Sequence, residues 1–290
     1  MDIQSAIAMR DITKKFKGFL LDIPFLEVPK GFSTALIGEN GAGKSTLLNI
    51  LAGIRLDYKG ESAYFGGEKE ERSIREKIGY TGPGNYFMPQ WTVSQVGEVS
   101  QLLFEQFDKE EFLKLCRTLD VREPEGAKKK NKSISALSDG MRMKVMLDAV
   151  FARDTKLLLL DEPASPLDPL MRDKLCSMIR EYLEMGNGEN SVFFSTHNIA
   201  DMESVTDYAV IMEKGKVVEQ GFVEDLKEKY IMVMGEAAEA ERAKEILYSF
   251  QKNSYGYVGL CLAKDLERLG GFDISTETPS LSQISIAVMK

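Results

Sequence analysis

The amino-acid sequence predicts an α/β protein built around a parallel sheet. Three short apolar runs, at residues 34–37, 157–160 and 191–194, have the length and composition of buried strands. Each run ends in glycine, acidic or hydroxyl residues, and stretches with helical spacing lie between the runs. Such alternation is typical of parallel sheets, in which polar residues at the strand ends collect along one edge. The residues that follow the three runs are therefore the candidates for a functional site.

Composition restricts the class of protein. The chain has 290 residues, of which 43% are apolar and 28% charged, as in ordinary globular proteins that bury a core. Its net charge of −8 argues against a nucleic-acid partner, because such proteins carry a basic face or a basic overall balance. The lysine-rich run at 128–132 is the main basic cluster, and we expect a solvated loop there rather than a binding patch.

The cysteines and the apolar segments indicate the compartment. Cys116, Cys176 and Cys261 lie far apart and show no metal-binding spacing, which fits a reducing cytosol. No run approaches the roughly 18 apolar residues of a membrane span, and the first residues lack the pattern of a signal peptide. We expect a cytoplasmic protein that reaches a membrane only through a partner.

The stretch "GENGAGKST" after the first apolar run carries the strongest motif. Its fixed positions match G-x-x-x-x-G-K-[ST], between a strand and a helical stretch. The glycines let successive backbone N–H groups face one phosphate, and the helix start adds its positive end. Lys44 would reach the β- and γ-phosphates, and the Ser45 hydroxyl would bind Mg²⁺. The predicted ATP-binding residues are Gly38, Asn40, Gly41, Ala42, Gly43, Lys44, Ser45 and Thr46.

Two adjacent carboxylates follow the second run, in "LLLLDEP". Asp161 at the strand end is placed to hold Mg²⁺ together with Ser45. Glu162 points elsewhere and is the natural group to orient or deprotonate an attacking water. Glu162 is therefore the candidate catalytic base.

Two further features have both a functional and a structural interpretation. In "LSDGM", a helix is expected to begin after Ser138, whose hydroxyl either caps that helix or helps its free N–H groups to bind an anion, and both can hold. His197, the single histidine, follows the third run directly. Taken alone, a lone histidine is more often structural than catalytic.

The order of these motifs resembles the ATP-binding cassettes of ABC transporters. The matching stretches are "GENGAGKST", "LSDGM", "LLLLDEP", "SPLD" and "STH", and the resemblance covers about residues 1–225. The segments "LSDGMRMK" and "TPSLSQISIAVMK" look most similar in sequence to ATPase subunits of bacterial exporters of the bacitracin-resistance type. The resemblance implies a P-loop NTPase fold of ABC type, with a parallel-sheet core, an antiparallel β subdomain and an α-helical subdomain at about 85–150.

The rest of the chain is predicted separately. Residues 226–290 are expected to form a small accessory α+β domain, with a helix across "EAAEAERAKEILYSF" (236–250). Its role is not evident from the sequence.

The resemblance also implies roles for particular residues. Two cassettes would sandwich ATP, so that Ser138 and Gly140 of one subunit touch the γ-phosphate held by the other. Asp168 would lie in the loop that links the two sites, and His197 would contact the γ-phosphate and help to hold Glu162. Phe16 would stack on adenine, although a core phenylalanine is the alternative. The implied partners are ATP, Mg²⁺, a transmembrane subunit that exports a compound, and a second cassette, either identical or related.

The sequence departs from the family pattern in three places. Asp139 and Met141 replace a glycine and a glutamine of the signature, and Thr81-Gly82-Pro83 stands where a cassette usually has a glutamine. Gln90 comes several residues late and is left without that role. Two functional alternatives remain: a soluble cassette ATPase acting on ribosomes or DNA, and a regulatory ATP-binding protein with little turnover.

Overall fold

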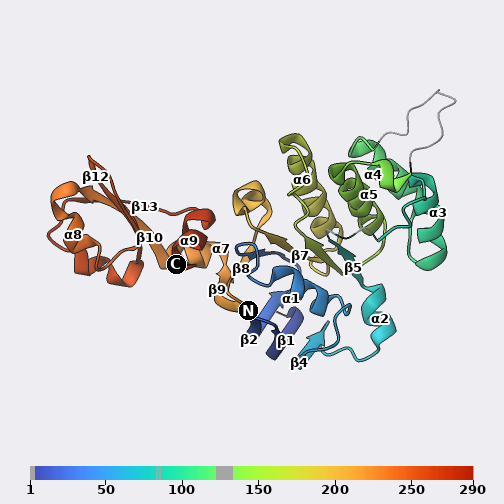
Figure 1. Ribbon diagram of the computed structural model, residues 1–290, viewed down its shortest axis with the longest axis horizontal. Helices are drawn as coiled ribbons and strands as arrows, with labels where there is room; N and C mark the ends of the chain where they lie inside the picture. Colours follow the sequence, from blue (N-terminus) through green and yellow to red (C-terminus); the bar gives the residue numbers. More distant parts are fainter. Residues whose placement is uncertain (1–3, 83, 85, 122–132, 290) are drawn as a thin grey trace.

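Three β-sheets organise the part of the chain that the structure, a computed structural model, describes: residues 4–82, 84, 86–121 and 133–289 (Figure 1). The lysine-rich run at 128–132 lies outside these residues. Within them, no helix has the length and apolar character that crossing a membrane requires.

Six strands of the described chain form the central sheet, in the order β5–β6–β7–β3–β8–β9. All neighbours pair in parallel except β8 and β9, which pair antiparallel. The strands are β3 (Ser33–Ile37), β5 (Ile78–Thr81), β6 (Leu157–Asp161), β7 (Ser191–Thr196), β8 (Tyr208–Glu213) and β9 (Lys216–Phe222). Every residue of β3, β6 and β7 is buried, so the three apolar runs are buried strands, as predicted.

Alternate residues of β6 face two different cores. Leu157 and Leu159 pack with α1 (Lys44–Leu51) and the N-terminal strands, whereas Leu158 and Leu160 pack with α5 (Asp139–Phe151) and α6 (Pro169–Met185). Successive side chains of a strand point to opposite faces, so one leucine run serves both layers. The register pairs Asp161 with Ser195 and Ile37 with Thr196, which aligns the polar ends of β6, β7 and β3 at one edge.

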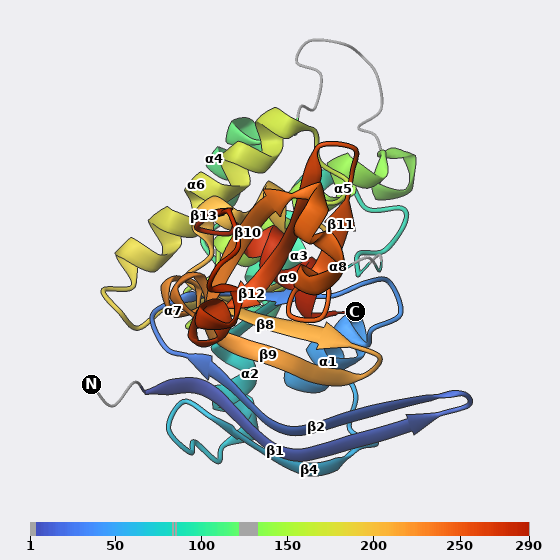
Figure 2. The same ribbon diagram turned by 90° about the vertical axis from the view of Figure 1, so that its left-hand side faces the viewer.

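An antiparallel sheet of β1 (Ser5–Phe16), β2 (Phe19–Pro29) and β4 (Lys59–Tyr64) covers the α1 face of the central sheet. In Figure 2 this sheet lies at the bottom of the molecule. The β1–β2 hairpin turns at Gly18, whose φ of 83° lies in the left-handed region that glycine adopts without strain. The short helix α2 (Glu71–Glu76) follows and leads into β5.

Most described residues between β5 and β6 belong to helices. These are α3 (Val93–Leu103), α4 (Lys109–Thr118) and α5. A capping box of Thr92 and Gln95 opens α3, and Asp108 caps α4, which satisfies free N–H groups at both helix starts. These three helices, together with the parallel sheet and the β1–β2–β4 sheet, are the arrangement that the sequence predicted.

The C-terminal part forms its own four-stranded antiparallel sheet in the order β11–β12–β10–β13 (Figure 1). Its strands are β10 (Tyr230–Glu236), β11 (Tyr248–Lys252), β12 (Gly256–Leu262) and β13 (Ile274–Glu277). They cover a small separate core that includes Val233, Leu247 and Cys261. The predicted boundary at 225/226 falls inside helix α7 (Val223–Lys229), so a division of the chain there stays a prediction.

The helix predicted across 236–250 is wrong. Only a 3₁₀ turn at Ala237–Glu239 and the short helix α8 (Ala240–Ala243) form, and β11 begins at Tyr248. The alanine- and glutamate-rich tract has high helix propensity, but its second half pairs with β12, where Tyr248 faces Leu260. Tertiary pairing overrides local propensity here.

The last helix, α9 (Leu281–Val288), joins the C-terminal part to the core of the central sheet. It packs on the 3₁₀ turn Ile199–Asp201, which follows β7. The backbone N–H of Leu281 donates to Glu203 Oε1 at 3.0 Å, and Ile284 is fully buried in the same core as Met202. The end of the chain therefore supports the segment just beyond His197.

The carboxyl group of Asp148 in α5 is buried in this core, where its charged form destabilises the folded protein. Asp148 is 0% exposed, and burial raises its pKa well above the ordinary value, while the weakly donating Cys116 thiol offsets little of that shift. The unfolded chain ionises this group from about pH 4 upward. The stability that a protonated Asp148 contributes is therefore lost as the pH rises from there through the folded-state pKa.

Asp148→Ala should accordingly stabilise the protein at pH 8. The free energy of unfolding should rise by about 1 kcal/mol or more, and the melting temperature should rise with it. The gain should shrink at pH 5, where the wild-type penalty is smaller. Asp173→Ala, an exposed aspartate of α6, is the control and should show neither effect. Thermal unfolding of the three proteins at both pH values is the measurement, and a gain that grows on acidification would contradict the assignment.

Candidate active site

The phosphate-loop residues lie between β3 and α1, as the motif predicted. Gly41 and Gly43 have φ values of 88° and 105°, in the region that disfavours other residues. A Cβ atom at Gly38 would lie 2.6 Å from the carbonyl oxygen of Met212, so a side chain has no room there. These glycines let the loop curl tightly before α1 begins at Lys44.

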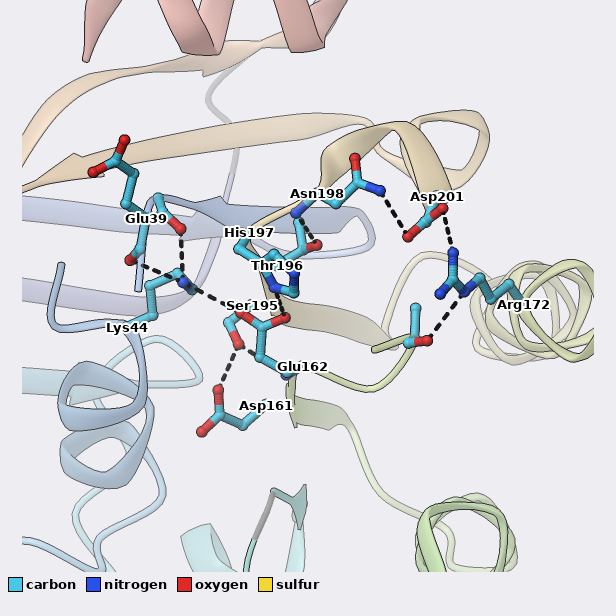
Figure 3. A network of polar contacts seen from close by, with 12 residues as sticks. Glu39, Lys44, Asp161, Glu162, Arg172, Ser195, Thr196, His197, Asn198 and Asp201 are labelled. Atoms are coloured by element: carbon cyan, nitrogen blue, oxygen red, sulfur yellow. Dashed lines mark hydrogen bonds and ion pairs between the residues drawn. The ribbon is translucent and has the colours of Figure 1, made fainter. Parts of the chain in front are cut away.

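The Lys44 side chain folds back over the loop. It is 6% exposed, and its Nζ donates to the carbonyl oxygens of Gly38 at 2.7 Å and Glu39 at 3.2 Å. The same Nζ forms an ion pair with Glu162 Oε1 at 3.2 Å (Figure 3). The ammonium group is thus held where the loop would receive phosphates, with a carboxylate as its present counter-charge.

A pocket of about 300 Å³ opens above the loop. Phe16 lies in its wall, together with Phe19, which the sequence analysis did not select. The cations of Lys14 and Arg55 lie 5.3 Å and 5.2 Å from the Phe16 ring centre. The other predicted residues in the wall are Asn40, Gly41, Gly43, Lys44, Ser45, Thr46 and Glu162. Gly38 and Ala42 do not line the pocket; Ala42 is buried beneath it, at 5% exposure.

Asp161 is suited to bind a metal ion. It is 1% exposed, and its Oδ1 accepts a hydrogen bond from Ser195 Oγ at 2.5 Å. Its Oδ2 is buried and has no hydrogen-bond partner among the described residues. A buried carboxylate oxygen without a partner fits the few protein ligands that Mg²⁺ takes beside phosphates and water. Among the described residues no group of three or more His, Cys, Asp or Glu side chains could form a metal cage instead.

Glu162 is held by several contacts at once. Its φ of 51° is in the left-handed region, which is unfavourable for a glutamate. Its N–H donates to Ser195 Oγ at 2.9 Å, and its Oε2 lies 2.8 Å from His197 Nδ1. Strained backbone of this kind collects at functional sites.

His197 lies at the end of β7 and reaches the site. This position is the one that a functional role for His197 requires. Its ring is 45% exposed and contacts the Glu162 carboxylate, so it is not a core residue (Figure 3). An imidazole that touches a carboxylate beside a phosphate loop can fix the orientation of that carboxylate or exchange a proton with it.

The signature residues lie apart from this pocket in the same chain. Ser138 caps α5, and its Oγ accepts from the N–H of Met141 at 3.2 Å, which is the structural interpretation of this serine. Asp139 pairs with Arg142 and is 83% exposed, so its charge points outward. A Cβ atom at Gly140 would lie 2.7 Å from the Pro166 carbonyl oxygen, which explains the glycine.

Asp168 and the segment after β5 also have local partners. Asp168 caps α6 through its Oδ1, which accepts from the N–H of Met171 at 3.1 Å. The hydroxyl group of Thr81 is buried and lies 3.5 Å from the Met143 sulfur, and Gln90 is exposed in a turn. Neither Thr81 nor Gln90 lines the pocket above the phosphate loop, so the place of the missing glutamine remains unassigned.

Ser195 is a second residue that the sequence analysis missed. It contacts both Asp161 and Glu162 and is fully buried. The available signal was its alternation with Ser191 and Phe193 along the strand, which places it on one face with a period of two.

The chain is similar in sequence to known proteins of the ABC transporter family. The family model described as "ABC transporter" matches residues 21–165. An ABC transporter ATP-binding protein of Nostoc sp. is 29% identical over 80% of this chain and 69% of its own. A Synechocystis ABC transporter ATP-binding protein is 30% identical over 68% of this chain, which spans 54% of it. The probable sulfate/thiosulfate import ATP-binding protein of Chlorella vulgaris is 30% identical over 77% of this chain and 94% of its own.

Solved structures show the same fold. The ATP-binding subunit of an ABC transporter superposes with a TM-score of 0.64 and 24% identity, covering 77% of this chain and 92% of the other. The dimeric cassette MJ0796, in a post-hydrolysis state with ADP and Pi, gives 0.62 at 19% identity, covering 74% and 98%. The P-loop fold with its parallel and antiparallel sheets, predicted from the sequence, is thereby confirmed. The chain belongs to the ABC transporter family.

Proposed function

We propose that the chain binds ATP with Mg²⁺ in the pocket above the phosphate loop and hydrolyses it, with Glu162 as the catalytic base. The observation that carries this proposal is the position of the Glu162 carboxylate, 3.2 Å from Lys44 Nζ and 2.8 Å from His197 Nδ1. A base must lie next to the phosphate-binding group and be oriented by a third residue, and this arrangement provides both.

Each residue of the pocket has a physical role in this proposal. Lys44 turns from Glu162 to the β- and γ-phosphates, beside the N–H groups of the loop. Ser45 and Asp161 would hold Mg²⁺, and the ion would supply positive charge to offset that of the phosphate oxygens. Glu162, released from Lys44, takes a proton from the attacking water, and His197 keeps the carboxylate oriented and reaches the γ-phosphate. Phe16 stacks on adenine at the wall of the pocket.

A second cassette completes the site. We infer that Ser138 and Gly140 of one subunit reach the γ-phosphate in the other, and that Asp168 lies between the two sites. The exposed start of α5 supports this, because the cation of Arg142 offsets the charge of Asp139 beside the signature. Each chain carries both half-sites, so a homodimer is sufficient, and a heterodimer with a related cassette is the alternative.

The cassette would drive a separate transmembrane subunit from the inner, cytoplasmic face of the membrane. We propose export, on the resemblance of "LSDGMRMK" and "TPSLSQISIAVMK" to bacitracin-resistance-type ATPases. One relative is named an import protein, so family membership alone leaves the direction open. The net charge of −8 speaks against nucleic acid as a partner.

The test is to purify the full chain, measure Mg²⁺-dependent ATP hydrolysis, and identify the membrane protein that co-purifies from native membranes. Hydrolysis together with an integral membrane partner supports the proposal, and loading vesicles that contain the pair shows the direction of transport. Hydrolysis without any membrane partner would favour the alternative, a soluble ABC-type ATPase with a regulatory or non-transport role.

His197→Ala should lower kcat by about 10²-fold or more, because the Glu162 carboxylate loses the group that orients it. The fold should be unchanged, since the imidazole is 45% exposed. Asn198→Ala is the matched control, because Asn198 is also exposed but does not contact Glu162. Steady-state kinetics and thermal unfolding of both variants decide the question, and a loss in kcat below threefold for His197→Ala would return this residue to a structural role.

A further inference from the structure

The hydroxyl group of Ser195 joins the two acidic residues at the end of β6. Its Oγ donates to Asp161 Oδ1 at 2.5 Å and accepts from the Glu162 N–H at 2.9 Å (Figure 3). Ser195 is 0% exposed, in a central strand whose register sets it opposite Asp161. A serine hydroxyl has one hydrogen to donate and lone pairs to accept, so this single group can donate to one neighbour and accept from the other.

The contact with Asp161 determines which carboxylate oxygen is available. Because Ser195 engages Oδ1, the other oxygen, Oδ2, is left buried without a partner among the described residues. Hydrogen bonds to a ligating carboxylate orient it and tune its affinity for a metal ion. Ser195 therefore presents Oδ2 in a fixed direction.

The contact with Glu162 fixes its backbone. Glu162 has a φ of 51°, a conformation that persists only when its surroundings hold it. Ser195 holds its N–H, and His197, two residues further along the chain, holds its carboxylate at 2.8 Å. Glu162 is thus attached to the end of β7 at two points, one on the backbone and one on the side chain.

We propose that Ser195 is a positioning residue that orients Asp161 toward Mg²⁺ and fixes the backbone from which Glu162 reaches the attacking water. The proposal rests on the function proposed above. Ser195 is fully buried, so it would act only through these two acidic residues.

The test compares Ser195→Ala with Ser195→Cys, which keeps the volume but has a weak donor, and with Ser191→Ala. Ser191 is the matched control because it lies in the same strand, is 0% exposed, and also accepts a backbone N–H, from Gly31 at 2.9 Å. Binding of a non-hydrolysable ATP analogue is measured by calorimetry with Mg²⁺ and with EDTA. Steady-state ATP hydrolysis and thermal unfolding are measured on the same proteins.

Ser195→Ala and Ser195→Cys should lose about 10- to 100-fold of the affinity gain that Mg²⁺ confers on the analogue, as is typical when a partner of a metal ligand is removed. Affinity in EDTA should stay within threefold of the parent. The kcat should fall by a similar factor while KM for ATP changes less, and Ser191→Ala should show none of these changes. A purely structural role would lower the melting temperature and leave the Mg²⁺ dependence intact.

The proposal is overturned if both Ser195 variants keep the parent's Mg²⁺ dependence and kcat within threefold. It is also overturned if Ser191→Ala shows the same losses, because the effect would then belong to the strand in general. If the parent binds the analogue but hydrolyses no ATP, the proposed function fails, and the Mg²⁺ titration still decides the role of Ser195.

Discussion

Glu162→Gln is expected to stop ATP turnover while ATP binding remains. The amide cannot take a proton from water, and loss of a general base typically costs about 10²- to 10⁴-fold in rate. Binding should be retained or tightened, because Lys44 is then free of its 3.2 Å ion pair with the Glu162 carboxylate. The measurement is kcat with MgATP, together with gel filtration in ATP, where a stable dimer should accumulate.

Glu68→Gln is the control for this variant. The Glu68 side chain is 22% exposed and pairs with Lys77 at 2.6 Å, close to the 21% exposure and the lysine pairing of Glu162, but it lies outside the pocket. It should hydrolyse ATP at the parent rate. Near-parent turnover by Glu162→Gln would mean that another group takes the proton.

Lys44→Ala should weaken ATP binding by about 10- to 100-fold, the equivalent of one strong charge-assisted hydrogen bond to the phosphates. A second effect also lowers the ATP affinity of this variant. Removing the ammonium leaves the Glu162 carboxylate without its counter-charge at the place where phosphates must enter. Calorimetry with ATP in EDTA measures the effect without hydrolysis.

A double variant separates the repulsion by Glu162 from the loss of the lysine–phosphate contact. Lys44→Ala combined with Glu162→Gln should lose less affinity than Lys44→Ala alone, because the repelling carboxylate is gone. Lys30→Ala, which removes a lysine paired with Glu189 at 2.7 Å outside the pocket, should bind ATP normally. Unchanged affinity in Lys44→Ala would mean that the phosphate loop is not the binding site.

The sequence alone allowed much of the fold to be predicted, since the buried strands are continuous apolar runs and the phosphate loop has fixed spacing. The secondary structure of residues 236–250 was not predictable in this way. The pairing of Tyr248 with Leu260 is a contact between distant parts of the sequence, which local propensity cannot reveal. The burial of Asp148 was missed for a related reason. The sequence of α5 by itself does not indicate that residue 148 is buried.

The site was predictable wherever a motif names the residue, as for Lys44 and Glu162. Contacts between strands were not predictable, and Ser195 is the main example, because its function depends on the register of β6 against β7. Ser138 and Asp168 show the opposite case. Each has a family motif, yet within one chain each is satisfied as an ordinary helix cap, so their proposed roles depend on a second subunit.

The docking of α9 has a practical consequence for anyone who expresses the cassette as a fragment. A truncation near residue 225 looks harmless on a map of motifs, because the phosphate loop, the signature and His197 all lie before it. It would nevertheless strip Leu281 and Ile284 from the apolar surface of Ile199 and Met202, which are 3% and 0% exposed in the full chain. That newly wetted surface begins two residues after His197, so a truncated cassette would combine a tendency to aggregate with a loosened catalytic strand end.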